Sequence, residues 1–135
     1  QYIFYKDKSE QNELLVEQLQ KLSQIKLLLN ELIIISTRKL ENLSLNLINE
    51  FKIKEIKTNS EITATQNFVS FSTVQSYKGM ESNYVVITDI EDITSEIARS
   101  LLYVGMSRAR YGLILMISGA MRNDYKEILK DIEDG

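Results

Sequence analysis

The sequence predicts an α/β fold with a mainly parallel sheet, and three observations lead to that prediction. Short apolar runs of the kind that form strands alternate with helix-like segments along the chain. Some of the strand-like runs are apolar throughout, as expected of strands buried on both faces of a parallel sheet. The helix-like segments between them can serve as crossover connections between parallel strands. We therefore expect the 135 residues to form one domain.

The first half of the chain is expected to hold three strands separated by two helices. The strand-like runs are rich in β-branched or aromatic residues, and the helix-like segments repeat leucine at helical spacing. In chain order, the expected elements are a strand over residues 2–5, a helix over 10–24, a buried strand over 32–36, a helix that ends near Glu50 and an edge strand over 51–56. Ser9 is the expected N-cap of the first helix, since its hydroxyl can accept a hydrogen bond from the first turn.

The second half is expected to begin with a polar loop and to continue with strands on both sides of an apolar helix. The loop covers residues 57–67, the strands cover 68–74, 84–90 and 113–118, the apolar helix covers 95–108, and a last helix covers 122–132. Thr94 is the expected N-cap of the apolar helix. In parallel α/β sheets, ligands bind beyond the carboxyl ends of the strands, so we expect function in loops that follow strands.

The composition narrows the chemistry open to the chain. It contains no cysteine and no histidine, which excludes disulfides, thiolate metal sites and histidine as a general base, and we predict no metal site. The net charge is −3 and the pI about 5.1, so any contact with nucleic acid is expected to be local. No apolar run reaches membrane-spanning length and no signal peptide is visible, so we expect a cytoplasmic protein without a membrane partner.

The first candidate site is the polar run of residues 73–81, which follows a predicted strand. It brings hydroxyls, an amide, a lysine and a glycine to the end of that strand, where their donors can reach phosphate groups. Gly79 allows the backbone to approach a ligand closely, and Glu81 can accept hydrogen bonds from a ribose. A plain turn between two strands explains the same residues, and chemistry alone favours that simpler interpretation.

The second candidate site is the run of residues 101–110, which ends the apolar helix with Arg108 and Arg110. Cations at a helix C-terminus are stabilising by about 0.3–1 kcal/mol, so a structural role is sufficient to explain both arginines. A guanidinium is also a permanently charged fork that suits phosphoryl oxygens. The residues alone leave the two interpretations about equal.

Together, the two runs resemble motifs of the UvrD-like superfamily 1 DNA helicases. Residues 73–81 (TVQSYKGME) are similar to motif V, T-x-H/Q-S-x-K-G-x-E, and residues 101–110 (LLYVGMSRAR) resemble motif VI, L-x-Y-V-x-x-[ST]-R-A. The order of the motifs and the apolar strand between them agree with the family, and the convincing part covers residues 68–118. Upstream, residues 33–38 (IIISTR) more weakly resemble motif IV, an apolar strand that ends in arginine.

The resemblance implies the C-terminal motor domain of such a helicase, a RecA-like fold of the P-loop NTPase type without its own Walker A loop. In this family two RecA-like domains clamp ATP between them. The implied catalytic residues, which would contact the γ-phosphate, are Arg108, as arginine finger, and Arg38. The implied nucleotide contacts are Lys78, Gly79 and Glu81, and the implied contacts to single-stranded DNA are Thr73, Gln75 and Ser76. Gln75 stands where many members have histidine, so it can hydrogen-bond DNA but cannot stack as an imidazole does.

The sequence has no G-x-x-x-x-G-K-[ST] run, so it lacks the usual means of holding ATP phosphates and Mg²⁺. The resemblance therefore implies ATP with Mg²⁺ as cofactor, with the Mg²⁺ held by an upstream N-terminal RecA-like domain of the same polypeptide. The chain begins with Gln1 rather than methionine, which agrees with a fragment of a longer chain. We expect the isolated chain to be inactive.

Other interpretations remain open at this stage. Only residues 39–72 separate the motifs that resemble IV and V, whereas larger helicases insert a domain there, so ATP-driven translocation is better supported than duplex unwinding. The main alternative is a degenerate motor domain that acts as a nucleic-acid- or protein-binding module. An ATPase that remodels RNA or a protein–DNA complex is a second, and an unrelated flavodoxin-like domain is a third.

Overall fold

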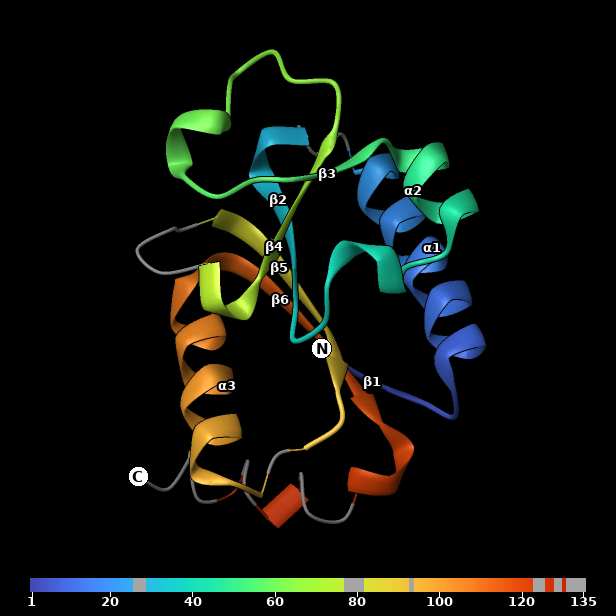
Figure 1. The fold of residues 1–135 in the computed structure, drawn as a ribbon, viewed down its shortest axis with the longest axis vertical. Helices are drawn as coiled ribbons and strands as arrows, with labels where there is room; N and C mark the ends of the chain where they lie inside the picture. Colours follow the sequence, from blue (N-terminus) through green and yellow to red (C-terminus); the bar gives the residue numbers. More distant parts are fainter. Residues whose placement is uncertain (26–28, 77–81, 93, 123–125, 128–129, 131–135) are drawn as a thin grey trace.

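The computed structural model describes residues 1–25, 29–76, 82–92, 94–122, 126–127 and 130. In this part of the chain, six strands form one sheet with helices on both of its faces (Figure 1). The strands are β1 Tyr2–Tyr5, β2 Leu32–Ser36, β3 Ile53–Glu55, β4 Val69–Thr73, β5 Ser82–Ile90 and β6 Ala109–Ser118, and the helices are α1 Lys8–Gln24, α2 Leu45–Phe51 and α3 Glu96–Arg108. A 3₁₀ turn, η4 Val74–Ser76, follows β4 directly.

The strands lie in the order β1-β6-β5-β2-β4-β3, and each neighbouring pair in that order is parallel. Ser36, the last residue of β2, lies opposite both Thr73 of β4 and Thr88 of β5. Three carboxyl ends are therefore aligned at one edge of the sheet. The predicted α/β class with a mainly parallel sheet is confirmed, and so is the edge position of β3.

An apolar core lies on each face of the sheet, and β2 contributes to both. Ile33 and Ile35 belong to one core, whereas Leu32 and Ile34 belong to the other. Helices α1 and α2 cover the face of Leu32 and Ile34, and α3 covers the opposite face (Figure 1). Full burial of such a side chain stabilises the fold by about 1.5–3 kcal/mol. The unalternated sequence of β2 thus reflects burial on both faces, as predicted.

Both predicted helix caps are wrong by one or two residues. Helix α1 is capped by Asp7 instead of Ser9, and the Asp7 carboxylate accepts a hydrogen bond of 2.9 Å from the backbone N–H of Glu10. Helix α3 is capped by Ser95 instead of Thr94. In each case two nearby residues are good caps, and the path of the preceding segment selects between them.

The boundaries of some elements also differ from those predicted. Strand β6 begins at Ala109, four residues before the predicted start, because its amino half is partly exposed and so lacks a continuous apolar run. The predicted edge strand over residues 51–56 is shortened to β3, since α2 extends to Phe51. The helix predicted over residues 122–132 falls largely outside the described residues.

Candidate functional site

A buried carboxylate, Asp89, lies where the carboxyl ends of the central strands meet. The Asp89 side chain accepts hydrogen bonds from the Ser36 hydroxyl at 2.6 Å, the Thr88 hydroxyl at 2.8 Å and the Gln11 amide at 2.8 Å. Only 5% of Asp89 is exposed. A buried charge is tolerated when it is fully hydrogen-bonded, and these donors come from β2, β5 and α1. Asp89 therefore ties three elements together at this edge.

The backbone of Asp89 adopts a left-handed conformation, with φ of 61°. Its N–H donates to the Gln11 side-chain oxygen at 2.7 Å, and its carbonyl accepts from the Thr37 hydroxyl at 2.9 Å. Aspartate is among the few side chains that adopt this conformation readily. Asp89 also lies at the irregularity in register between β5 and β6, so it redirects the chain as β5 ends.

Arg38 lies at the same edge, two residues after β2. Its backbone N–H donates to the Ser36 hydroxyl at 3.0 Å, and its guanidinium forms an ion pair of 2.6 Å with Glu91. Both side chains are about half exposed, at 47% and 52%. The hydrogen bond that the guanidinium donates to the Glu91 carboxylate raises the pKa of Arg38 further above its ordinary value. The Arg38 backbone is therefore fixed through Ser36, while its charged head stays accessible.

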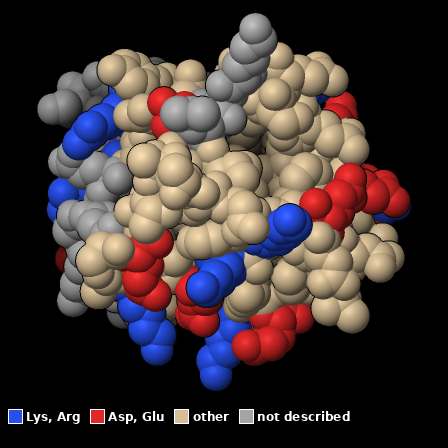
Figure 2. All heavy atoms as spheres, turned by 90° about the horizontal axis from the view of Figure 1, so that it is seen from above, with Lys and Arg blue, Asp and Glu red and all other residues tan. Residues whose placement is uncertain are grey.

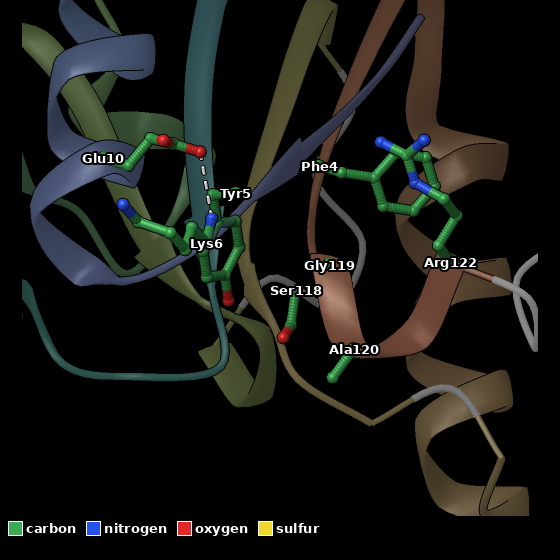
Figure 3. Close-up of a pocket in the computed structure, with 8 residues that line it drawn as sticks. All are labelled: Phe4, Tyr5, Lys6, Glu10, Ser118, Gly119, Ala120 and Arg122. Carbon is green, nitrogen blue, oxygen red and sulfur yellow. Dashed lines mark hydrogen bonds between the residues drawn. The ribbon is translucent and has the colours of Figure 1, made fainter.

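A groove of about 440 Å³ lies beyond the carboxyl ends of β1 and β6 (Figure 3). Lys6 and Arg122 stand on its opposite flanks, and the Arg122 guanidinium lies 4.6 Å from the centre of the Phe4 ring. Tyr5, which also lines the groove, is buried, and its hydroxyl has no hydrogen-bond partner among the described residues. Burial raises the pKa of the Tyr5 hydroxyl, and the negative charges of Asp89 and Glu91 raise it further.

Arg108 is the last residue of helix α3 and lies immediately before β6. It is partly buried, and its Nε atom is fully buried without a hydrogen-bond partner among the described residues. The helix approaches β5 closely at Gly105, where an added Cβ would lie 2.3 Å from the Cδ1 of Ile87. Arg108 is therefore held by a closely packed helix.

The two runs that resemble helicase motifs meet in space. Val74, at the start of η4, packs in the same apolar core as Leu102 and Met106 of α3. Figure 1 accordingly shows η4 beside the carboxyl-terminal half of α3. The η4 turn and the end of α3 therefore share one part of the apolar core, although they are far apart in the sequence.

The remaining predicted site residues are only partly described. The Thr73 hydroxyl donates to the Ser76 hydroxyl at 3.2 Å, which orders the two side chains within and just before η4. The backbone of Gln75 lies in η4, and its side chain lies outside the described part of the structure. The predicted nucleotide contacts, Lys78, Gly79 and Glu81, fall outside the described residues.

The structure does not bring the two predicted phosphate-binding arginines together. Arg108 directly precedes β6, whose first residue lies opposite Ser82 at the start of β5. Arg38 follows β2, whose last residue lies opposite Thr88 near the end of β5. At about 3.3 Å per residue, β5 extends about 20 Å from Ser82 to Thr88. The two arginines therefore lie towards opposite ends of the strands.

Asp89 and Glu91, which organise the carboxyl edge, were not among the site residues predicted from the sequence. A signal was present in the sequence, because Asp89 interrupts the apolar run at the end of the predicted strand and Glu91 follows it directly, where parallel sheets place functional loops. The partners of Asp89 could not be read from the sequence, since Gln11 lies 78 residues away.

Charges of both signs are interspersed on the face that Figure 2 shows. Lys and Arg side chains alternate there with Asp and Glu around an uncharged centre, and no continuous basic patch is seen among the described atoms of this face. Within the described residues, no three acidic side chains gather where they could hold a metal ion. None of the described helices is long and apolar enough to cross a membrane.

Comparisons with known proteins agree with the motifs. Residues 68–116 match the UvrD-like helicase C-terminal domain family. The fold is similar to that of the C-terminal domain of a possible DNA helicase from Lactobacillus plantarum WCFS1, with a TM-score of 0.66 and 21% sequence identity, over 87% of this chain and 72% of that one. No curated protein matches the chain significantly. The resemblance to the UvrD-like helicase C-terminal domain, predicted from the sequence, is thus confirmed over residues 68–116, within a fold shared with a helicase C-terminal domain.

Proposed function

We propose that the chain is the second motor domain of an ATP-dependent DNA helicase or translocase, and that Arg108 is its arginine finger. The observation that carries this proposal is the buried Nε of Arg108 at the end of α3, which has no hydrogen-bond partner among the described residues. Leaving a buried charged donor without a partner is costly, so a ligand that supplies an anion there would be stabilising.

The position of Arg108 supports this role over that of a helix-end charge alone. A cation that only complements the helix dipole has no need to bury its Nε, because solvated cations at a helix end are already stabilising. Close packing of Gly105 on β5 fixes the end of α3 that carries Arg108, and Val74 of η4 packs in the same apolar core as this helix. The arrangement supports a preorganised donor for a γ-phosphate oxygen, with Lys78, Gly79 and Glu81 as the proposed nucleotide contacts.

The described residues do not provide a site for Mg²⁺, and the chain has no Walker A loop. In our proposal an N-terminal RecA-like partner domain therefore holds ATP and Mg²⁺. This chain closes the cleft from the other side. When ATP is bound between the two domains, the negative charge of its γ-phosphate would attract the Arg108 guanidinium across the cleft.

We assign the single-strand contacts to the carboxyl edge of the sheet. Thr73 lies opposite Ser36 in the sheet, so the Thr73 and Ser76 hydroxyls and the Arg38 guanidinium follow neighbouring strands. Hydroxyl and guanidinium groups are common contacts to nucleic-acid phosphates. Because Arg38 and Arg108 lie towards opposite ends of the strands, we group Arg38 with the nucleic-acid contacts, together with Gln75. Closure and opening of the ATP cleft would then move this edge relative to the partner domain and advance it along one strand.

The test is ATP hydrolysis by the natural full-length protein, with and without single-stranded DNA. Arg108→Ala is expected to lower kcat by about 10³-fold, as expected of an arginine finger, while nucleotide binding persists. Arg99→Ala, which removes an exposed arginine from the same helix, is the matched control and is expected to retain activity. Normal hydrolysis by a folded Arg108→Ala protein would refute the finger assignment. A wild type without hydrolysis would favour the alternative of a degenerate motor that acts as a binding module.

A further inference from the structure

The Arg38–Glu91 ion pair joins the segments that follow β2 and β5, at a switch point in the topology of the sheet. The connection after β2 leads to α2 on one face of the sheet, and the connection after β5 leads to α3 on the opposite face. In open parallel sheets, a crevice between strands whose connections diverge in this way is where ligands bind. Arg38 comes from the β2 side of this switch point and Glu91 from the β5 side.

Both partners of this pair are positioned by the same buried residue. The Asp89 carboxylate holds the Ser36 hydroxyl, which in turn accepts the Arg38 backbone N–H at 3.0 Å. The Asp89 carbonyl holds the Thr37 hydroxyl, and Glu91 follows Asp89 by two residues. The backbones of the pair are thus fixed, while the two charged heads meet at 2.6 Å in half-exposed positions.

We propose that Glu91 competes for Arg38 with a phosphate of single-stranded nucleic acid, and so sets how strongly Arg38 binds that phosphate. A carboxylate and a phosphodiester present similar oxygen acceptors to a guanidinium, so a phosphate that engages Arg38 must displace Glu91. This inference rests on the proposed nucleic-acid contact of Arg38. Asp89 is the positioning residue of the ion pair, since it fixes the backbone that precedes Arg38 and lies two residues before Glu91.

The strength of the pair suits a displaceable contact. Ion pairs between exposed side chains are weak and are screened by salt, so a phosphate can compete with Glu91 at modest energetic cost. Removing the competitor is therefore expected to strengthen binding by about two- to fivefold. The gain should shrink as the salt concentration rises, because salt weakens the pair in the wild type.

The experiment is a double-mutant cycle in the natural full-length protein, read out by the affinity for a labelled oligothymidylate. The variants are Glu91→Gln, Arg38→Ala and the double variant, with Glu41→Gln as a control that removes an exposed carboxylate close to Arg38 in sequence. We expect Glu91→Gln to tighten binding, Arg38→Ala to weaken it, and Glu91→Gln to have no further effect once Arg38 is absent. Thermal melting of each variant verifies that it is folded.

The outcomes separate this inference from the proposed function. If Glu91→Gln tightens binding equally in the wild-type and Arg38→Ala backgrounds, or if Glu41→Gln tightens it as much as Glu91→Gln does, the effect is one of general charge. Either result would overturn the inference. Unchanged binding by folded Glu91→Gln would show that Glu91 does not compete for Arg38, and weaker binding would show that Glu91 supports the site. Either result also overturns the inference. If the wild type binds no oligothymidylate, the proposed nucleic-acid function fails, and the inference fails with it.

Discussion

The Ser36 hydroxyl donates to the buried Asp89 carboxylate over 2.6 Å, although 53 residues separate them in the sequence. This hydrogen bond joins the ends of two neighbouring parallel strands and fixes the start of the loop that carries Arg38. The stability of the fold and the geometry of the candidate site therefore depend on the same carboxylate.

Replacement of Asp89 is expected to destabilise the fold substantially. Asp89→Ala removes a charged acceptor and leaves buried hydroxyl and amide donors without a partner, so we expect a loss of about 2–4 kcal/mol in the free energy of unfolding. Asp89→Gly also removes the acceptor but suits the φ of 61° better, so its loss should be smaller by about 1 kcal/mol. Urea denaturation of the two variants measures the difference, and equal losses would show that the backbone conformation carries no cost.

Asp92 is expected to make the start of α3 sensitive to acid. Hydrogen bonds from the backbone N–H of Thr94 and from the Thr94 and Ser95 side chains lower the pKa of Asp92 to about 2 in the folded protein. Because the folded pKa is below the ordinary value of about 4, Asp92 contributes fully to the stability of the fold above pH 4. That contribution to the free energy of unfolding is lost as the pH falls towards 2. Asp92→Asn should therefore flatten this part of the stability–pH curve. Parallel curves for wild type and variant between pH 4 and pH 2 would contradict the assignment.

Gly105 is expected to be required for close packing of α3 on the sheet. In Gly105→Ala, the new Cβ would meet the Cδ1 of Ile87 at 2.3 Å, so the isoleucine must shift, and overpacking of this kind costs about 1–3 kcal/mol. The better helix propensity of alanine offsets about 1 kcal/mol of that cost. We expect a net loss of about 1 kcal/mol by thermal or chemical denaturation. Ile87→Val removes the clashing atom, so the double variant should lose less than the sum of the single changes.

Thr73 and Arg38 are expected to contribute to single-strand binding in different ways. Thr73→Val keeps the shape of the side chain but removes a hydrogen bond, so it should weaken binding by about two- to tenfold at any salt concentration. Arg38→Ala also removes a charge, so it should reduce the slope of log affinity against log salt by about 0.7. Titrations of oligothymidylate at several salt concentrations distinguish the two effects. A reduced slope for Thr73→Val would mean that the substitution disturbs a charged neighbour.

The sequence was sufficient for the order of the strands and helices and for the matched motifs because these depend on local patterns. The run from Leu32 to Ser36 is apolar throughout since its side chains enter both cores, and that signal lies in five consecutive residues. The amino half of β6 gave no such signal, because Tyr111 and its neighbours face solvent there. Cap positions differed by one or two residues where neighbouring residues were equally suitable.

The arrangement of the candidate site depends on long-range pairing that no local pattern records. Motif resemblance assigned Arg38 and Arg108 to one phosphate, whereas the register of β5 with its neighbours places them towards opposite ends of the strands. The contact between η4 and α3 and the hydrogen bonds of Asp89 likewise follow from the order of strands in the sheet.

The short edge strand β3 limits which other chains can pair with the sheet of this domain. Its three residues end in exposed Lys54 and Glu55, and the Lys54 ammonium lies 5.2 Å from the centre of the Phe68 ring. Short edges with charged side chains are poor templates for pairing with a foreign strand. In the proposed motor, each opening of the cleft between the two domains would expose the flanks of this domain to other chains. On its β3 side, the sheet is already protected against being extended by one of them.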